Sequence, residues 1–173
     1  MAPESLKRKL TAILSADVEG YSRLMGDDEE STILTLHNYR TAMTFLIQKH
    51  RGRVVDAPGD NLLAEFPSAV DAVTGAVEIQ RELAERNAKL SDERKMYFRI
   101  GVNVGDVVEN EDRIYGDGVN IAARIQEAAE SNGVFVSQSL FEQVKRQSAY
   151  RFEDLGLHSL KNISEQIRLY KVV

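Results

Sequence analysis

Two aspartates stand where short predicted strands end or begin, and carboxylates placed in this way can hold a metal ion. Asp17 ends the apolar run Leu10–Ala16, and Asp60 lies in a turn-rich segment just before the run Asn61–Phe66. A hard cation such as Mg²⁺ takes a few carboxylate oxygens and leaves its other positions to water and phosphate. Taken singly, each aspartate is better explained as a turn cap or a hairpin-tip residue. If the fold brings them together, the pair favours a metal site.

Other residues could bind phosphate. The segment Val18–Ser22 contains Gly20 and Tyr21 and is typical of a turn before a helix, whose backbone N–H groups can hold phosphate oxygens. Arg99 lies within an apolar strand-like run, where a charged side chain usually points to solvent. Lys161 by itself indicates nothing.

A predicted helix near residue 120 carries an amide and a guanidinium on one face. Asn120 and Arg124 are four positions apart, and residues at this spacing are neighbours on a helix surface. A guanidinium beside an amide suits a phosphate and a sugar hydroxyl. The alternative is a solvated polar stripe in which Glu127 pairs with Arg124, and the spacing alone favours that alternative.

Composition excludes several classes of protein. The 173 residues carry a net charge of −5, so the chain lacks the basic surface that nucleic acid or anionic lipid requires. Cysteine is absent, which excludes disulfides, thiolate metal sites and a cysteine nucleophile and fits a reducing, cytoplasmic setting. No apolar run approaches the roughly 20 residues that cross a bilayer. We therefore expect a soluble chain with no membrane insertion and no nucleic-acid partner.

The elements that must position these residues alternate between strand and helix. Helices are predicted from about Asp28, from Pro67, from Asp117 or Gly118, and over 139–146. Strands are predicted at 10–16, 53–56, 61–66, 96–104, 106–114 and 134–137, with two more in 150–173. The order of the first six elements is that of a ferredoxin-like split βαβ unit, and the later elements extend it. The fold class is α+β, an α/β sandwich in one domain over 10–173 after a lead-in over 1–9.

This topology has a consequence for the two aspartates. In a split βαβ unit the third strand lies beside the first and runs antiparallel to it. The end of the first strand, with Asp17, is therefore expected beside the start of the third, with Asp60. The sequence thus predicts that the two carboxylates converge.

Four ordered segments together resemble the class III nucleotidyl cyclases, the family of adenylate and guanylate cyclase catalytic domains. The resemblance runs from about Lys9 to Val173, and the fold that it implies is the nucleotide cyclase fold. Its segments are similar to the family's first and second metal motifs, its central hairpin and its transition-state helix: 13–22, 52–66, 98–105 and 115–124.

The resemblance implies a role for each candidate residue. Asp17 and Asp60 would hold two divalent cations, Mg²⁺ or Mn²⁺, while Asn120 would orient the ribose and Arg124 would stabilise the α-phosphate. The triphosphate would be bound by residues of three separate segments: Gly20, Tyr21, Arg99 and Lys161. In the family the metal aspartates and the Asn/Arg pair of one site come from different protomers, which implies a head-to-tail homodimer.

The sequence departs from the family pattern at the residues that read the base. The family's adenine reader is typically a lysine, and its place is taken by Asp56, while an ungapped count puts Arg113 in the place of its usual Asp or Thr partner. An acceptor and a donor exchanged in this way suit guanine or uracil. Alternatively, Asp56 and Arg113 pair with each other and leave the base unread, or a one-residue gap puts Asp112 in that position.

Two functions follow from these features. The first is an enzyme that converts ATP, or GTP, to the 3′,5′-cyclic nucleotide and pyrophosphate. The alternative is a regulatory dimer of the same fold that binds nucleotide with little or no turnover. The intact metal and Asn/Arg sets favour the enzyme, and the altered base readers favour the regulatory dimer.

Overall fold

Eight strands and five helices make up most of the part of the chain that the computed structural model describes, residues 6–147 and 149–173. The strands are β1 (Lys7–Val18), β2 (Arg53–Asp56), β3 (Leu62–Phe66), β4 (Phe98–Asn110), β5 (Arg113–Tyr115), β6 (Val134–Ser137), β7 (Phe152–His158) and β8 (Ile167–Val172). The helices are α1 (Tyr21–Asp27), α2 (Glu29–Lys49), α3 (Ala69–Asn87), α4 (Asp117–Ala128) and α5 (Gln138–Val144). None of these five helices is long and apolar enough to cross a bilayer.

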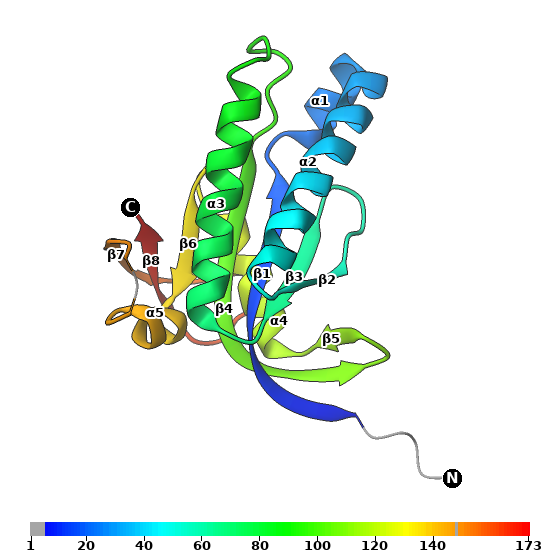
Figure 1. The fold of residues 1–173 in the computed structure, drawn as a ribbon. Coiled ribbons are helices and arrows are strands. Elements are labelled where there is room, and N and C mark those ends of the chain that lie inside the picture. Colours follow the sequence, from blue (N-terminus) through cyan, green and yellow to red (C-terminus); the bar gives the residue numbers. More distant parts are fainter. Residues whose placement is uncertain (1–5, 148) are drawn as a thin grey trace.

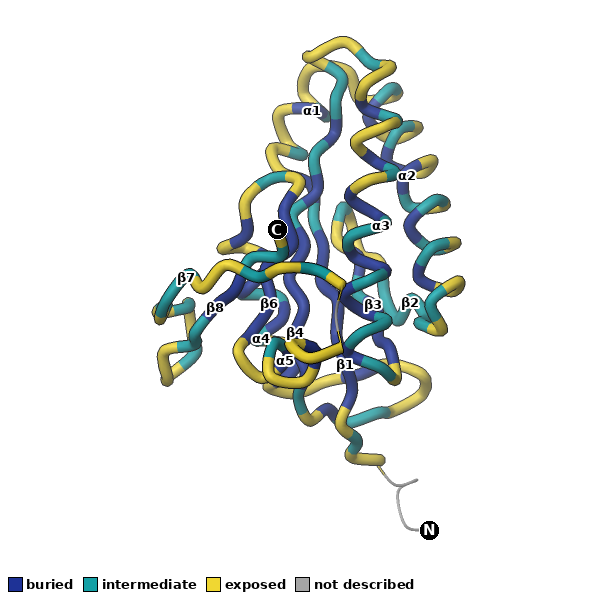
Figure 2. Tube along the Cα trace, turned by 60° about the vertical axis from the view of Figure 1, so that its left-hand side comes forward, coloured by how far each residue is buried: buried dark blue, intermediate teal, exposed yellow. Residues whose placement is uncertain are grey.

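All eight strands belong to one sheet with helices on both faces. The strand order is β2-β3-β1-β4-β6-β8-β7, and β5 pairs with the far end of β4. Helices α2 and α3 cover one face and α4 covers the other (Figure 1). Strand β1 is buried on both faces. Its even-numbered side chains pack toward α2 and α3. On the other face Ile13 packs under α4 with Val107, Ile114 and Ala122. The central strands therefore form the buried middle of the molecule (Figure 2).

The predicted α+β class and the split βαβ core are confirmed. Strand β1 pairs antiparallel with both β3 and β4, as the topology required. Side-chain caps define several helix starts, because Asp28 accepts the Ser31 N–H and Ser68 accepts the Asp71 N–H. The first strand begins at Lys7, three residues before the predicted start. Residues 1–5 of the expected lead-in lie outside the described part of the chain.

Two local predictions are wrong. The segment after Gly20 was expected to be only a turn, but it forms the short helix α1 before α2 begins. The central hairpin was expected to return from Asp106, but β4 continues to Asn110 and the turn consists of Glu111 and Asp112. Both turn residues have positive φ, 51° and 67°, the backbone conformation that the tightest two-residue hairpins need.

Helix α4 lies directly on the backbone of β4 because glycines leave no side chain between them. A Cβ on Gly101 would lie 2.4 Å from the Gln126 nitrogen, and one on Gly105 would lie 3.2 Å from the Gly118 Cα. Asn103 Nδ2 donates to the Gly118 carbonyl at 3.1 Å and holds the first turn of the helix. The glycines of β4 thus serve close packing, which explains why the hairpin does not turn at Gly105.

This contact predicts a large loss of stability in the Gly101→Ala variant. We expect a fall of about 3 kcal/mol in the free energy of unfolding, because the added methyl meets helix backbone that cannot rotate away. Gly26→Ala is the matched control, since a Cβ there meets nothing within 4 Å, and we expect it to raise stability by roughly 0.5 kcal/mol. Urea unfolding of both variants measures the difference. Equal stability of the two variants would contradict the packing described here.

Candidate functional site

The two aspartates meet at one end of the sheet. Ala16 of β1 lies opposite Leu62 of β3, so the end of one strand is beside the start of the other. Asp60 Oδ2 accepts the Val18 N–H at 3.1 Å, which ties the β2–β3 loop to the residue after Asp17. The predicted convergence is confirmed, and the role of the pair as metal ligands stays a prediction.

Arg99 was expected to point into solvent, because it is a charged residue in an apolar strand. In the structure its side chain points toward Asp17 instead. The two residues are direct partners in the β1–β4 register. Arg99 Nε and Nη2 donate to the two carboxylate oxygens of Asp17 at 2.9 and 2.6 Å, and Nη1 donates to the Glu127 carbonyl at 3.1 Å. The strand thus presents a cation at the same point as the two acidic side chains.

Burial raises the pKa of the Asp17 carboxyl, and the charges of Asp60 and Glu127 act in the same direction, whereas Arg99 opposes them. A divalent cation would relieve this crowding of negative charge. No group of three or more acidic and histidine side chains in the described residues is placed to hold a metal ion. Two carboxylates nevertheless fit a cation that takes its remaining oxygen ligands from water and phosphate.

A hollow of about 300 Å³ lies between the end of β1, the β2–β3 loop and α4. Its lining includes Asp17, Asp56, Asn61, Ala123 and Glu127. Helix α4 borders it with Ala123 and Glu127, among others. One chain therefore gathers one metal candidate, Asp17, and one base-reading candidate, Asp56, around a single concave surface.

The Asn/Arg pair and Lys161 are not among the described residues that line this hollow. Asn120 is exposed, and Arg124 Nη1 donates to Glu127 Oε1 at 2.9 Å, as the solvated-stripe alternative expected. Lys161 is exposed in the loop between β7 and β8, at the edge of the sheet opposite β2. Within one chain none of these three residues lines the hollow beside Asp17, and Arg124 is connected to it only through its ion pair with Glu127.

The phosphate-binding candidates that follow β1 lie at the start of α1. Gly20 has a φ of 68°, and its carbonyl accepts the Leu24 N–H in the first helical turn that includes Tyr21. The N–H of Glu19 is used by the Tyr97 carbonyl at 2.9 Å. This segment leaves β1 directly beside the Asp17 carboxylate.

The two base-reading candidates face each other. Asp56 ends β2 and Arg113 begins β5, and Arg113 Nη1 lies 3.6 Å from Asp56 Oδ2. Their side chains are 39% and 58% exposed, so both stay within reach of a ligand. The alternative in which Asp56 and Arg113 pair with each other is the arrangement present in the structure.

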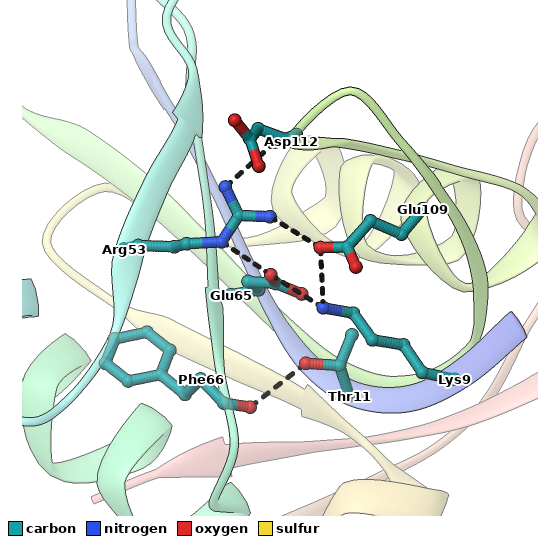
Figure 3. Close-up of polar contacts among 7 residues, drawn as sticks. All are labelled: Lys9, Thr11, Arg53, Glu65, Phe66, Glu109 and Asp112. Atoms are coloured by element: carbon teal, nitrogen blue, oxygen red, sulfur yellow. Dashed lines mark hydrogen bonds and ion pairs between the residues drawn. The ribbon is translucent and has the colours of Figure 1, made fainter. Parts of the chain in front are cut away.

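Sequence reasoning missed a set of charged residues behind this pair. Four strands contribute them to one closed set of ion pairs (Figure 3): Lys9, Arg53, Glu65 and Glu109. The one sequence feature that pointed to these ion pairs was Glu65, a carboxylate between apolar neighbours in a strand predicted to be buried. Such a residue requires cationic partners, but nothing local indicates which cations supply them.

Comparisons with known proteins identify the family to which this fold belongs. The sequence model of the adenylate and guanylate cyclase catalytic domain matches residues 5–172. A putative adenylate cyclase of Rhizobium meliloti is 42% identical over 98% of this chain, which spans 29% of that relative. A solved adenylate/guanylate cyclase/hydrolase from Silicibacter pomeroyi superposes with a TM-score of 0.86 at 36% identity, over 96% of this chain and 98% of that one. An adenylyl cyclase of P. aeruginosa has the same fold, with a TM-score of 0.85 at 22% identity over 98% and 96% of the two chains. The chain therefore belongs to the family of adenylate and guanylate cyclase catalytic domains, the class III nucleotidyl cyclases.

Proposed function

We propose that this chain is a class III cyclase that converts ATP, with GTP as a second substrate, to the 3′,5′-cyclic nucleotide and pyrophosphate. The observation that carries this proposal is the meeting of Asp17 and Asp60 beside an open hollow, in a chain of this family. In the reaction the ribose 3′-oxygen loses its proton and forms a bond to the α-phosphorus, while the bond from that phosphorus to the oxygen of pyrophosphate breaks. Pyrophosphate leaves with the electron pair of the broken bond.

Asp17 and Asp60 would hold two divalent cations, Mg²⁺ or Mn²⁺. When bound, such cations lower the pKa of the 3′-hydroxyl and neutralise charge on the triphosphate. Arg99 donates to the Asp17 carboxylate, and Gly20 and Tyr21 follow the end of β1 at the start of α1. Arg99 and the backbone of Gly20 and Tyr21 would hold triphosphate oxygens. These residues would fix the phosphate chain while the 3′-oxygen attacks.

Asn120, Arg124 and Lys161 would complete the site from a second copy of the chain. Support comes from their position outside the lining of the Asp17 hollow within one chain and from the exposure of Asn120 and Lys161. A two-fold, head-to-tail homodimer would bring both sets together twice and form two equal sites. Arg124 would then stabilise charge on the α-phosphate, and Asn120 would orient the ribose.

Asp56 and Arg113 would read the base. Asp56 offers an acceptor that suits the N1–H and N2–H₂ groups of guanine, and Arg113 offers donors that suit its O6. Their pairing with each other weakens both contacts, so we expect some turnover of ATP and a higher tolerance of GTP than in a relative with lysine in place of Asp56.

The same ion pair favours the second candidate function, a cyclase-fold dimer that binds nucleotide with little or no turnover. Incubation with each of the four ribonucleoside triphosphates and Mg²⁺ or Mn²⁺, followed by mass spectrometry of the products, distinguishes the two functions. We expect cyclic AMP or cyclic GMP together with pyrophosphate. Nucleotide binding without any cyclic product would favour the regulatory dimer.

A further inference from the structure

Four charged side chains form a closed ring of alternating sign across four strands (Figure 3). Lys9 Nζ contacts Glu65 Oε1 and Glu109 Oε2, each at 3.0 Å. Arg53 contacts the same two oxygens, through Nε at 2.8 Å and Nη2 at 3.0 Å. We call these four residues the charge ring. It joins β1, β2, β3 and β4 at the end of the sheet opposite Asp17.

The ring is held in place by its buried member. The side chain of Glu65 is only 6% exposed and lies opposite Ile13 in the β1–β3 register, among apolar residues. Both cations contact its Oε1, and its Oε2 is buried with no hydrogen-bond partner among the residues that the structure describes. A buried carboxylate of this kind needs its cations, so the position of the Arg53 guanidinium is closely defined.

Among the described contacts of the four ring residues, only those of Arg53 include the turn between β4 and β5. Its Nη1 donates to the Asp112 carbonyl at 2.8 Å. Glu111 and Asp112 both adopt left-handed backbone conformations, which are unfavourable for residues with a Cβ. The hydrogen bond from Arg53 therefore supports a turn whose own sequence does not favour its geometry.

Arg53 thus connects the two strands that carry the base-reading candidates. Asp56 ends the strand that Arg53 begins, and Arg113 follows directly after Asp112. The β2–β3 register shifts between Val54 and Asp56 before Asp56 pairs with Leu63, so the strand that carries Asp56 is irregular, and the contacts of Arg53 fix its other end. We propose that Arg53 is a positioning residue for base recognition, which holds Asp56 and Arg113 opposite each other. This inference rests on the proposed function.

Lys9 provides a matched control because it contacts the same two carboxylates and, among the residues that the structure describes, makes no hydrogen bond to the turn. Arg53→Met and Lys9→Met each remove one cation from the ring and one partner from buried Glu65, so both are expected to lower the melting temperature. Only Arg53→Met releases the Asp112 carbonyl. A purely structural ring predicts the same behaviour for both variants.

The test measures base preference in the full chain in two ways. One is the ATP/GTP ratio of kcat/KM, and the other is the ratio of Kd for the α,β-methylene analogues of the two nucleotides, which does not depend on turnover. We expect Arg53→Met to change both ratios about tenfold, the effect of one displaced hydrogen-bond partner, and Lys9→Met to change them less than about twofold. Amide hydrogen exchange over 110–114 should accelerate in Arg53→Met alone.

Arg53→Lys separates positioning from stability. Lysine keeps the positive charge beside Glu65 but has one nitrogen in place of three, so it cannot contact both carboxylates and the turn in the same geometry. We expect this variant to recover most of the melting temperature and to retain the altered ratio. Recovery of both properties would mean that only the charge matters, and the positioning role would be wrong.

A reference variant distinguishes failure of this inference from failure of the proposed function. Asp56→Lys combined with Arg113→Asp keeps an ion pair but reverses its polarity, and it should shift preference toward ATP. If this variant changes the ratio and Arg53→Met does not, base reading stands and the positioning role of Arg53 is overturned. If neither variant changes the ratio in a chain that still forms cyclic nucleotide, Asp56 and Arg113 do not read the base and the positioning role of Arg53 is overturned, while the cyclase function stands. If the chain binds neither nucleotide, the proposed function is wrong as well.

Discussion

Asp17→Ala and Asp60→Ala should each reduce cyclic-nucleotide formation by at least about a thousandfold. A lost metal site removes several kcal/mol of transition-state stabilisation, and each 1.4 kcal/mol corresponds to about a tenfold change in rate. The carboxylates approach each other at the end of β1, so neither can be replaced by the other. Product formation measured across titrations of Mg²⁺ and of Mn²⁺ tests this expectation, and a chelator should abolish activity in the unmodified chain.

Asp154→Ala is the control for Asp17→Ala, because it also removes an aspartate that pairs with an arginine. Asp154 lies on β7 and pairs with Arg168 through Arg168 Nη1 at 3.0 Å, away from the hollow beside Asp17. We expect full activity from this variant. The melting temperature of every variant separates loss of chemistry from loss of fold. Full activity of a folded Asp17→Ala or Asp60→Ala chain, with metal present or removed, would disprove the two-metal assignment.

Mixing two inactive variants should restore about a quarter of the activity of the unmodified chain. The variants are Asp17→Ala and Arg124→Ala, whose residues do not line the same hollow within one chain but would meet across a dimer. In a mixed dimer one site inherits both defects and the other inherits neither. Random pairing makes about half of the dimers mixed, and each of those has one intact site of two.

The pair Asp17→Ala and Asp60→Ala is the control mixture. Both changes affect the same half of the site, so each site of their mixed dimer keeps one defect and no activity should return. Native mass spectrometry establishes that the subunits have exchanged. Absence of recovery in the first mixture despite proven exchange would mean that each site is built within one chain.

Much of the fold could be predicted because it depends on residues close together in the chain. Hydrophobic runs and turn residues defined β2 and β6 at their observed bounds and β3 to within one residue. The split βαβ order then predicted that Asp17 and Asp60 converge. The prediction failed at Gly105, which looks like a turn residue in sequence but serves the close approach of α4.

The ion pairs of Arg99 and of the charge ring could not be predicted, because a charged side chain has many possible partners until the strands are in register. Sequence alone placed Arg99 in a strand and suggested solvent, but the β1–β4 register sets it opposite Asp17. Lys9 and Glu109 are 100 positions apart, and only the packed sheet brings them to 3.0 Å. The sequence by itself determined the strands, the core and the two converging carboxylates. The tertiary structure decided which charges pair, because desolvation inside the fold leaves each buried carboxylate dependent on the cations that the register places beside it.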